Sequence, residues 1–261
     1  MLKNIRENLI DYLTSLLGAI TFYTVIPLPD HWPKNFQSIA RWSPIIGIAI
    51  GAILGMGDKI LTFIGFPVTV ASALIIALGI YLTGGLHLDG VMDSADGLGV
   101  TDSQKRLIVM QDSVSGAFGV MAGIMVIILK IVALSAISQD RCWGLMVAYG
   151  WGRWGQVNAI AFYPYLKPTG KGAFHKQYIH IPQDLLWGLL SLWGMSGLWI
   201  GINPAQWQLG IIMGGVGMAI AIGVSAWFNH RFGGHTGDTY GAVVEWTETL
   251  ILCLLTLKFS G

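Results

Sequence analysis

The segment AFGVMAGIMVIILKIVALSAIS, Ala117–Ser138, is mainly apolar over the length that an α-helix needs to cross a bilayer. A spanning helix requires about 20 mainly apolar residues. Six other stretches have a similar character: Trp42–Ile64, Val68–Leu86, Trp143–Phe162, Leu185–Ile202, Gln208–Phe228 and Val243–Leu257. In the first of these, Trp42–Ile64, Asp58 and Lys59 break the second half of the apolar stretch. The sequence therefore predicts an all-α, polytopic transmembrane helical bundle of about seven spans.

The composition supports this prediction. Of the 261 residues, 54% are hydrophobic and only 11% are charged, against about 25% charged in a soluble domain. Each charge at the centre of a span costs about 2.5–3.5 kcal/mol on insertion scales, so the deficit is expected in lipid. We predict a single integral membrane domain over residues 1–261, with the lipid bilayer as its surroundings. The net charge of +1 gives no electrostatic basis for nucleic-acid binding. The sequence is compatible with a homo-oligomer and does not determine the oligomeric state.

The N-terminal segment is less clear. Leu9–Ile26 is apolar but contains Asp11 and several hydroxyl side chains, which indicates an interfacial or re-entrant helix. Asp11 and the absence of a convincing small-residue cleavage site argue against a signal peptide. Cys142 and Cys253 lie in apolar surroundings without metal-ligand spacing, and we interpret both as packing residues.

Three polar connections are long enough to hold chemistry: His87–Gly116, Tyr163–Asp184 and Asn229–Ala242. Because the intervening connections are short, alternating spans place all three on one side of the membrane. That side carries most of the basic residues, among them Lys105, Arg106, Lys167, Lys171, Lys176 and Arg231. By the positive-inside rule this side is cytoplasmic, so we predict a multi-pass protein of the cell (inner or plasma) membrane with cytoplasmic active-site loops.

The most informative segment is GGLHLDGVMDSADGLG, residues 84–99. Asp89, Asp93 and Asp96 have the spacing i, i+4, i+7, which places them on one face of a helix. Three carboxylates on one face repel each other unless a cation neutralises them, and oxygen ligands favour a hard ion such as Mg²⁺ that also bridges substrate phosphates. The alternative is a solvated acidic face, but no Lys or Arg lies between residues 84 and 104. We predict a divalent-metal site formed by these three residues.

Other polar residues are candidates for the same site. Asp112, before Gly116-Ala117-Phe118-Gly119, either joins the site or caps the following helix. His87 either touches substrate or is an interfacial histidine. The glycine-rich turn with Gly234 and Gly237 offers backbone N–H groups to a phosphate, and Asp238 follows it.

Three charged residues enter apolar segments. Glu245 and Glu248 begin the last predicted span, where ionisable residues are costly and mark functional sites. Arg153 lies inside Trp143–Phe162 and either pairs with a carboxylate or phosphate or extends to the interface. We include all three among the predicted substrate- or phosphate-binding residues.

These stretches together resemble the cobalamin synthase family, also called adenosylcobinamide-GDP ribazoletransferases. The resemblance rests on GGLHLDG at 84–90 continuing to Asp93 and Asp96-Gly97, on the segment from Asp112-Ser113 to Gly119, and on Gly237-Asp238 running to Glu245 and Glu248. It extends over nearly the whole chain, whose length and hydropathy also fit.

The resemblance implies a Mg²⁺-dependent transferase of a substituted phosphate group. The 5′-hydroxyl of α-ribazole, or of its 5′-phosphate, attacks the cobinamide-linked phosphorus of adenosylcobinamide-GDP. GMP leaves and adenosylcobalamin, or its phosphate, forms in the last assembly step of cobalamin biosynthesis. Such chemistry needs charge neutralisation and positioning. Asp93 or Asp112 is then a candidate to accept the hydroxyl proton, and Arg153 and the turn at 233–237 are candidates to hold phosphate oxygens.

The alternative function is an ion-coupled secondary transporter, because such proteins also place acids inside glycine-interrupted spans. Transporter sites lie near the bilayer midplane, however, whereas Asp89–Asp96 are expected to follow the end of a full-length apolar span. No inverted repeat is evident in the sequence either. We therefore favour the enzyme.

Overall fold

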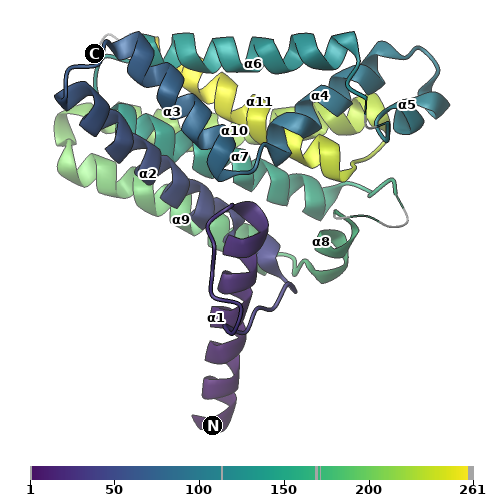
Figure 1. Cartoon of the computed structure of the whole chain (residues 1–261). Helices are drawn as coiled ribbons and strands as arrows, with labels where there is room; N and C mark the ends of the chain where they lie inside the picture. The colour runs from purple at the N-terminus through teal and green to yellow at the C-terminus, as the bar shows by residue number, and fades with distance from the viewer. Residues whose placement is uncertain (1, 113, 168–169, 171, 258–261) are drawn as a thin grey trace.

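The computed structural model describes residues 2–112, 114–167, 170 and 172–257, with residues 2–8 described by their backbone alone. Throughout these ranges the ordered elements are helices, and the prediction of an all-α protein is confirmed (Figure 1). Ser113 and Lys171 lie outside the described residues. The helices in chain order are α1 Leu2–Tyr23, η1 Ile39–Trp42, α2 Ser43–Phe63, α3 Val68–Leu82, α4 Leu86–Gly99, α5 Ser103–Val109, α6 Ala117–Ala136, α7 Arg141–Phe162, α8 Ala173–Tyr178, α9 Gln183–Ile202, η2 Pro204–Gln206, α10 Trp207–Phe232 and α11 Gly237–Leu254.

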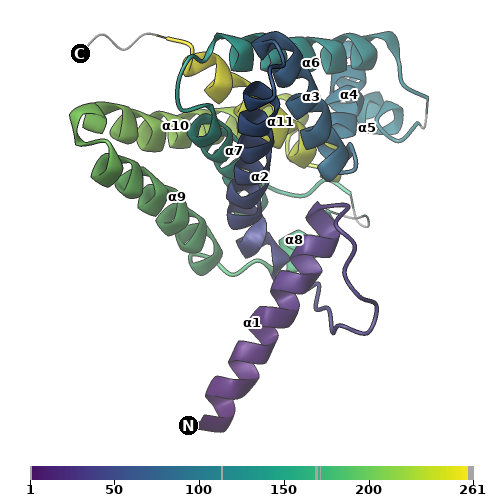
Figure 2. The same cartoon turned by 60° about the vertical axis from the view of Figure 1, so that its left-hand side comes forward.

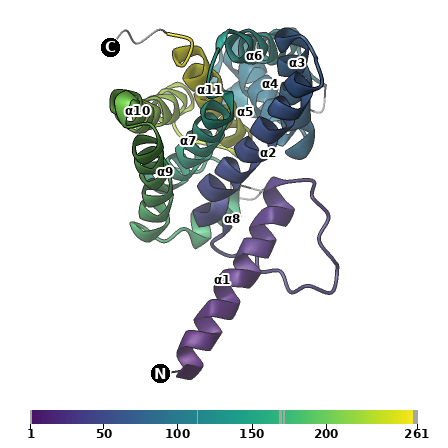
Figure 3. The same cartoon turned by 90° about the vertical axis from the view of Figure 1, so that its left-hand side faces the viewer.

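Helix α7 is the centre of the bundle, buried along most of its length and contacting α2, α9, α10 and α11 (Figures 1 and 3). Its closest neighbour is α2, where Gly47 and Gly51 face the backbone of Tyr149 and Leu145. A Cβ atom at either glycine would collide with that backbone. Small residues spaced four apart allow two membrane helices to approach this closely, and dispersion contacts then hold them together.

Four helical segments are long and apolar enough to cross a membrane: Ile39–Phe63, Ala117–Ala136, Gln183–Ile202 and Pro204–Phe232. A fifth is obtained if α3 and α4 count as one bent span. The membrane-helix bundle is therefore confirmed, whereas the count of seven is not. The predicted spans Trp143–Phe162 and Val243–Leu257 correspond to α7 and α11, which are helices but whose polar residues face the interior of the bundle.

The expected span Val68–Leu86 is not a full-length helix, and this corrects the prediction. Helix α3 ends at Leu82, and Gly84 and Gly85 follow with φ angles of 63° and 70°. A positive φ costs glycine little because it has no Cβ. The pair turns the chain by 89° into α4, so the acidic segment packs within the bundle on α6 and α11 instead of following a complete span.

Asp58 does not break α2, contrary to the prediction. The helix continues to Phe63 because Asp58, only 3% exposed, forms a bidentate ion pair with Arg141 at N···O distances of 2.7 and 2.6 Å. The bidentate guanidinium satisfies both oxygens of the buried carboxylate with hydrogen bonds.

Helix α1 projects from the rest of the molecule in every view (Figures 1, 2 and 3). Its last turns bury Ala19 and Tyr23 against the core, whereas Leu9 and Leu13 are exposed. The apolar part, Leu9–Tyr23, is shorter than the helices that qualify as spans. Its interfacial position stays a prediction.

Candidate active site

The predicted acidic face belongs to α4, and the structure brings a distal acid to it. Asp89 is exposed, Asp93 and Asp96 are half-buried, and Asp93 interacts electrostatically with both as well as with Asp238 and Lys167. Helix α11 approaches so closely that a Cβ at Gly90 would collide with the carbonyl oxygen of Asp238. Asp238, a candidate for this site from the sequence, therefore lies beside the acidic face.

Asp96 also has a structural partner. Its Oδ2 accepts a hydrogen bond from the backbone N–H of Gly116 at 2.7 Å, and its Oδ1 accepts one from Gly119 at 2.8 Å. The carboxylate therefore satisfies N–H groups at the start of α6, where a negative charge is also favoured by the helix dipole. Asp112 does not cap this helix: it is exposed, and its Oδ1 accepts from Val114 N within its own turn.

The three polar connections meet at one end of the bundle, as predicted. Arg106 donates a 2.8 Å hydrogen bond to the carbonyl oxygen of Arg231. The segment after α7 pairs with the turn before α11 through Leu166 and His235, whose backbone N···O distance is 2.8 Å. Lys167 then reaches Asp238 at 3.0 Å. Lys167 thus places a positive charge beside the acidic face, a role not predicted for it from the sequence.

The glycine-rich turn has fewer free N–H groups than predicted. His235 N donates to Pro164 O, and Thr236 N and Thr239 N bond reciprocally with each other's hydroxyl oxygens. Gly234 is buried, and a Cβ there would lie 2.7 Å from atoms of Leu166 and Pro164. The turn therefore holds two segments of protein together, and its amides are largely used for that purpose.

His235 is a buried neutral histidine within this turn. Its Nε2 lies 3.2 Å from the carbonyl oxygen of Ser225, and its Nδ1 lies 3.1 Å from Thr239 Oγ1. Burial lowers its pKa to about 4. The neutral ring therefore donates from Nε2 to Ser225 and links α10 to the start of α11.

Glu245, Glu248 and Arg153 form a separate buried cluster with Lys130 of α6. Lys130 Nζ lies 2.5 Å from Glu245 Oε2 and 2.6 Å from Glu248 Oε2. Arg153 Nη1 lies 2.7 Å from Glu248 Oε1. All four are nearly inaccessible, and two cations balance two anions, so the cluster is neutral and ties α6, α7 and α11 together.

The cluster corrects one interpretation of Arg153, which is completely buried and does not extend to the interface. Its carboxylate partner is Glu248. Lys130 is not among the residues predicted from the sequence, although an ionisable residue inside an otherwise apolar span is a functional signal by itself.

His87 is also inside the protein. It is 3% exposed, it faces α11 at Gly241, and its Nδ1 has no hydrogen-bond partner among the described residues. The interpretation as an interfacial histidine is therefore wrong.

The protein side chains do not by themselves form a complete metal cage. Within the described ranges no three His, Cys, Asp or Glu side chains converge closely enough to hold an ion. Mg²⁺, however, usually takes one or two carboxylates, with water and substrate phosphates completing its octahedron. Asp89 and Asp93, with Asp238 nearby, supply donors of this type. The residues fit a metal that is bound together with substrate.

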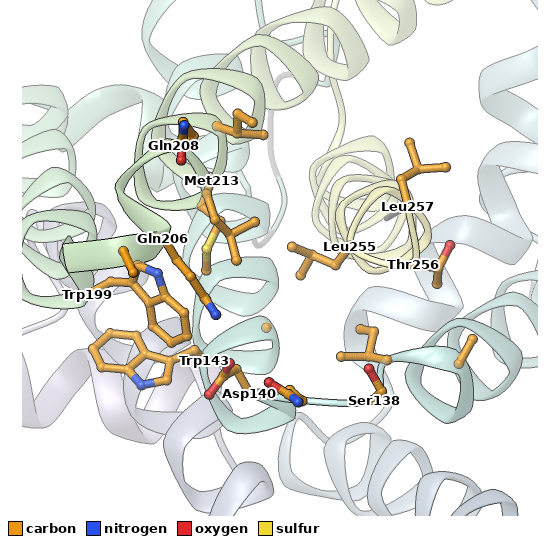
Figure 4. A pocket seen from close by; sticks show the side chains of 17 residues that line it. Ser138, Asp140, Trp143, Trp199, Gln206, Gln208, Met213, Leu255, Thr256 and Leu257 are labelled. Atoms are coloured by element: carbon orange, nitrogen blue, oxygen red, sulfur yellow. The ribbon is translucent and has the colours of Figure 1, made fainter. Parts of the chain in front are cut away.

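A cavity of about 980 Å³ lies elsewhere in the bundle. It is lined by residues of the α6–α7 connection and of α9, α10 and the C-terminal segment, with Trp143, Trp199 and Gln206 on one side and Leu255 on the other (Figure 4). None of the residues predicted from the sequence lines it. The acidic face of α4, with Asp238 and Lys167, is therefore the site where the arrangement fits phosphate chemistry: carboxylates for a metal or a proton, and a cation for an anionic group.

Comparison with known proteins gives a consistent result. The family model described as cobalamin-5-phosphate synthase matches residues 15–256. The chain is 54% identical over 245 residues to the adenosylcobinamide-GDP ribazoletransferase of Trichormus variabilis, covering 94% of this chain and 97% of the relative. It is 48% identical to the enzyme of the same name from a Synechocystis species, covering 93% and 94% of the two chains. No solved structure matches the chain. The chain belongs to the cobalamin-5-phosphate synthase family.

Proposed function

We propose that this protein is an adenosylcobinamide-GDP ribazoletransferase. It joins adenosylcobinamide-GDP to α-ribazole or α-ribazole 5′-phosphate, forming adenosylcobalamin or its phosphate and releasing GMP. The observation that carries the proposal is that Asp89 and Asp93 on α4 lie close to Asp238 and Lys167 from two distant segments. The chain also matches relatives of that name over nearly their full length.

The reaction is a displacement at phosphorus. The ribazole 5′-oxygen forms a bond to the cobinamide-linked phosphorus, the bond from that phosphorus to the GMP oxygen breaks, and the hydroxyl proton passes to a base. Asp93 is the base we favour, because it is half-buried among other carboxylates and like charges favour proton uptake. Asp112 is less suited because it is exposed and bonded within its own turn.

Asp89 would hold Mg²⁺ together with the substrate phosphates, which leaves Asp93 to accept the proton, and Asp96 is aligned beside them by its bonds to α6. When bound, Mg²⁺ supplies charge neutralisation for the diphosphate and for the leaving GMP. Lys167 would contact a phosphate oxygen, because its ammonium is held beside the acidic face by Asp238 and its side chain is partly exposed to an incoming substrate.

The protein would lie in the plasma membrane with this site on the cytoplasmic side. The support is the excess of Lys and Arg in the connections that gather there. A cytoplasmic site would also give direct access to a nucleotide-activated substrate.

The test is an assay of the purified, detergent-solubilised protein with adenosylcobinamide-GDP and α-ribazole. We expect adenosylcobalamin and GMP to appear in equal amounts, and only in the presence of Mg²⁺. Omitting the ribazole is the control, because GMP released without an acceptor would indicate hydrolysis. Absence of product with both α-ribazole and its 5′-phosphate would contradict the proposal.

A further inference from the structure

An apolar groove of about 450 Å³ lies between α4, α6, α10 and α11. Its walls include Leu98, Gly223, Trp227, Trp246 and Leu250. Trp227 and Leu250 are 44% and 42% exposed, so the groove opens on the outer surface of the bundle. Such a surface faces hydrocarbon in a membrane protein, because an apolar patch of this kind is costly in water.

Ser94 is the polar residue of the groove. Its side chain is 1% exposed, and its hydroxyl has no hydrogen-bond partner within the described part of the chain. Ser94 and Leu98 are four positions apart and share one face of α4, and Asp89 and Asp93 share another. The five-residue offset between the two pairs turns the Ser94 face away from the Asp89 face, toward the opposite side of the helix. A buried hydroxyl without a partner is costly, which indicates that a ligand atom accepts its hydrogen bond.

Positive charge lies at one end of the groove. Arg231 follows Trp227 by one helical turn, and its guanidinium carbon is 5.4 Å from the centre of the Trp227 ring. Arg106 bonds to the backbone carbonyl oxygens of Val100 and Arg231. Neither arginine has a carboxylate within 4.0 Å among the described residues, so both guanidinium groups retain charge for an external anion.

We propose that the groove binds one acyl chain of an anionic phospholipid, with the lipid phosphate at Arg231 and Arg106. The apolar walls fit a hydrocarbon chain, and the arginines complement the phosphate. Ser94 donates to an ester oxygen of the lipid. The arginines lie at the end of the bundle where the basic connections gather, and anionic lipids are attracted to such juxtamembrane cations by about 1 kcal/mol for each basic residue.

A lipid bound in this groove also contacts the helix that carries the acidic face. Its floor is α4, the helix that carries Asp89 and Asp93 on its other side, and α4 is joined to α3 through the turn at Gly84 and Gly85. An acyl chain in the groove packs against α4 from the membrane side and so supports this helix. Lipid binding in this groove does not depend on the proposed enzymatic function.

The experiment uses full-length protein in phosphatidylcholine nanodiscs containing a minor fraction of phosphatidylglycerol with a photoactivatable acyl chain. Crosslinked peptides are mapped by mass spectrometry. We expect labelling of α4 and of the α10 segment around Trp227. Gly223→Leu fills the groove without a clash, because no atom lies within 4 Å of a Cβ built there, and it should abolish this labelling. Gly215→Leu is the matched control in the same helix, with equally open surroundings, and should retain it.

The charge is tested with Arg231→Gln against Lys59→Gln, an exposed lysine next to Asp58. Arg231→Gln should reduce the preference for phosphatidylglycerol over phosphatidylcholine about fivefold, while Lys59→Gln leaves it unchanged. Equal labelling in Gly223→Leu and Gly215→Leu would overturn the proposal. Crosslinks from the groove to a second copy of the chain, in place of lipid, would also overturn it.

Discussion

Lys130 Nζ lies 2.6 Å from Glu248 Oε2 in the interior of the bundle, and the same nitrogen lies 2.5 Å from Glu245 Oε2. The two glutamates therefore share one buried cation, and Glu248 has a second cation in Arg153. Removing one partner of a buried ion pair leaves an uncompensated charge, which is more costly than losing the pair as a whole.

Replacing this cation should destabilise the protein strongly. We expect Lys130→Met to lower the free energy of unfolding by about 3–5 kcal/mol, seen as a reduced Tm in detergent. Adding Glu245→Gln should recover part of the loss, because Glu248 keeps Arg153 as its partner. The exposed Lys59→Met is the control. A Tm for Lys130→Met equal to that of the control would show that the cluster does not stabilise the fold.

Much of the fold could be predicted from the sequence, because span length and apolar character are local properties. The helices of α2, α6, α9 and α10 were predicted within a few residues. The polar interior was harder to anticipate. Asp58 was expected to interrupt a span because its partner, Arg141, is distant in sequence.

The candidate site was predicted in part for the same reason. Spacing alone placed Asp89, Asp93 and Asp96 on one face of a helix, whereas the partners of each carboxylate depend on packing. The bonds from Gly116 and Gly119 to Asp96, and the approach of Lys167 to Asp238, join residues that are 20 to 71 positions apart. The turn at Gly84 and Gly85, which directs α4 back into the bundle, is a backbone feature that hydropathy does not reveal.

Asp96 should affect stability as well as activity. Asp96→Ala removes the acceptor for two N–H groups at the start of α6, and loss of a helix cap typically costs about 1 kcal/mol. We expect a lower Tm for Asp96→Ala and an unchanged Tm for Asp112→Ala, whose carboxylate is exposed. An equal effect of the two substitutions on Tm would mean that the bonds to α6 contribute little.

Stability should fall as the pH drops below about 6.5. Burial lowers the pKa of His235 to about 4 and that of His175 to about 3, so the unfolded chain binds more protons than the folded one between those values and about 6.5. Each histidine then contributes a slope approaching about 1.4 kcal/mol per pH unit in that window. The measurement is Tm between pH 7 and pH 5.

His235→Gln should reduce this pH dependence, whatever its effect on Tm at pH 7, because one of the two histidines no longer titrates. His31→Gln is the control, since His31 is exposed. An identical decrease in Tm on acidification for wild type and His235→Gln would show that His235 is not responsible.

The three connections should be accessible from one side of the membrane. In a background with Cys142 and Cys253 replaced, cysteines at Lys105, Lys167 and Arg231 should react with a membrane-impermeant maleimide from the cytoplasmic side only. A cysteine at Lys59 should react only from the opposite side. Labelling of the three connection positions from different sides would contradict the proposed orientation.

We propose that Asp89 and Asp93 carry the phosphoryl-transfer chemistry, and the turnover of their Asn variants across a Mg²⁺ titration tests this role. Neither carboxylate has a protein hydrogen bond in the described chain, so both variants should insert and purify normally. Asp11→Asn, on the projecting helix α1, is the matched control. We expect turnover to fall by at least about 10²-fold in Asp89→Asn and Asp93→Asn, with a raised Mg²⁺ requirement in at least one of them. Near-normal turnover of both variants at the Mg²⁺ concentration that saturates the wild type would contradict a catalytic role for Asp89 and Asp93.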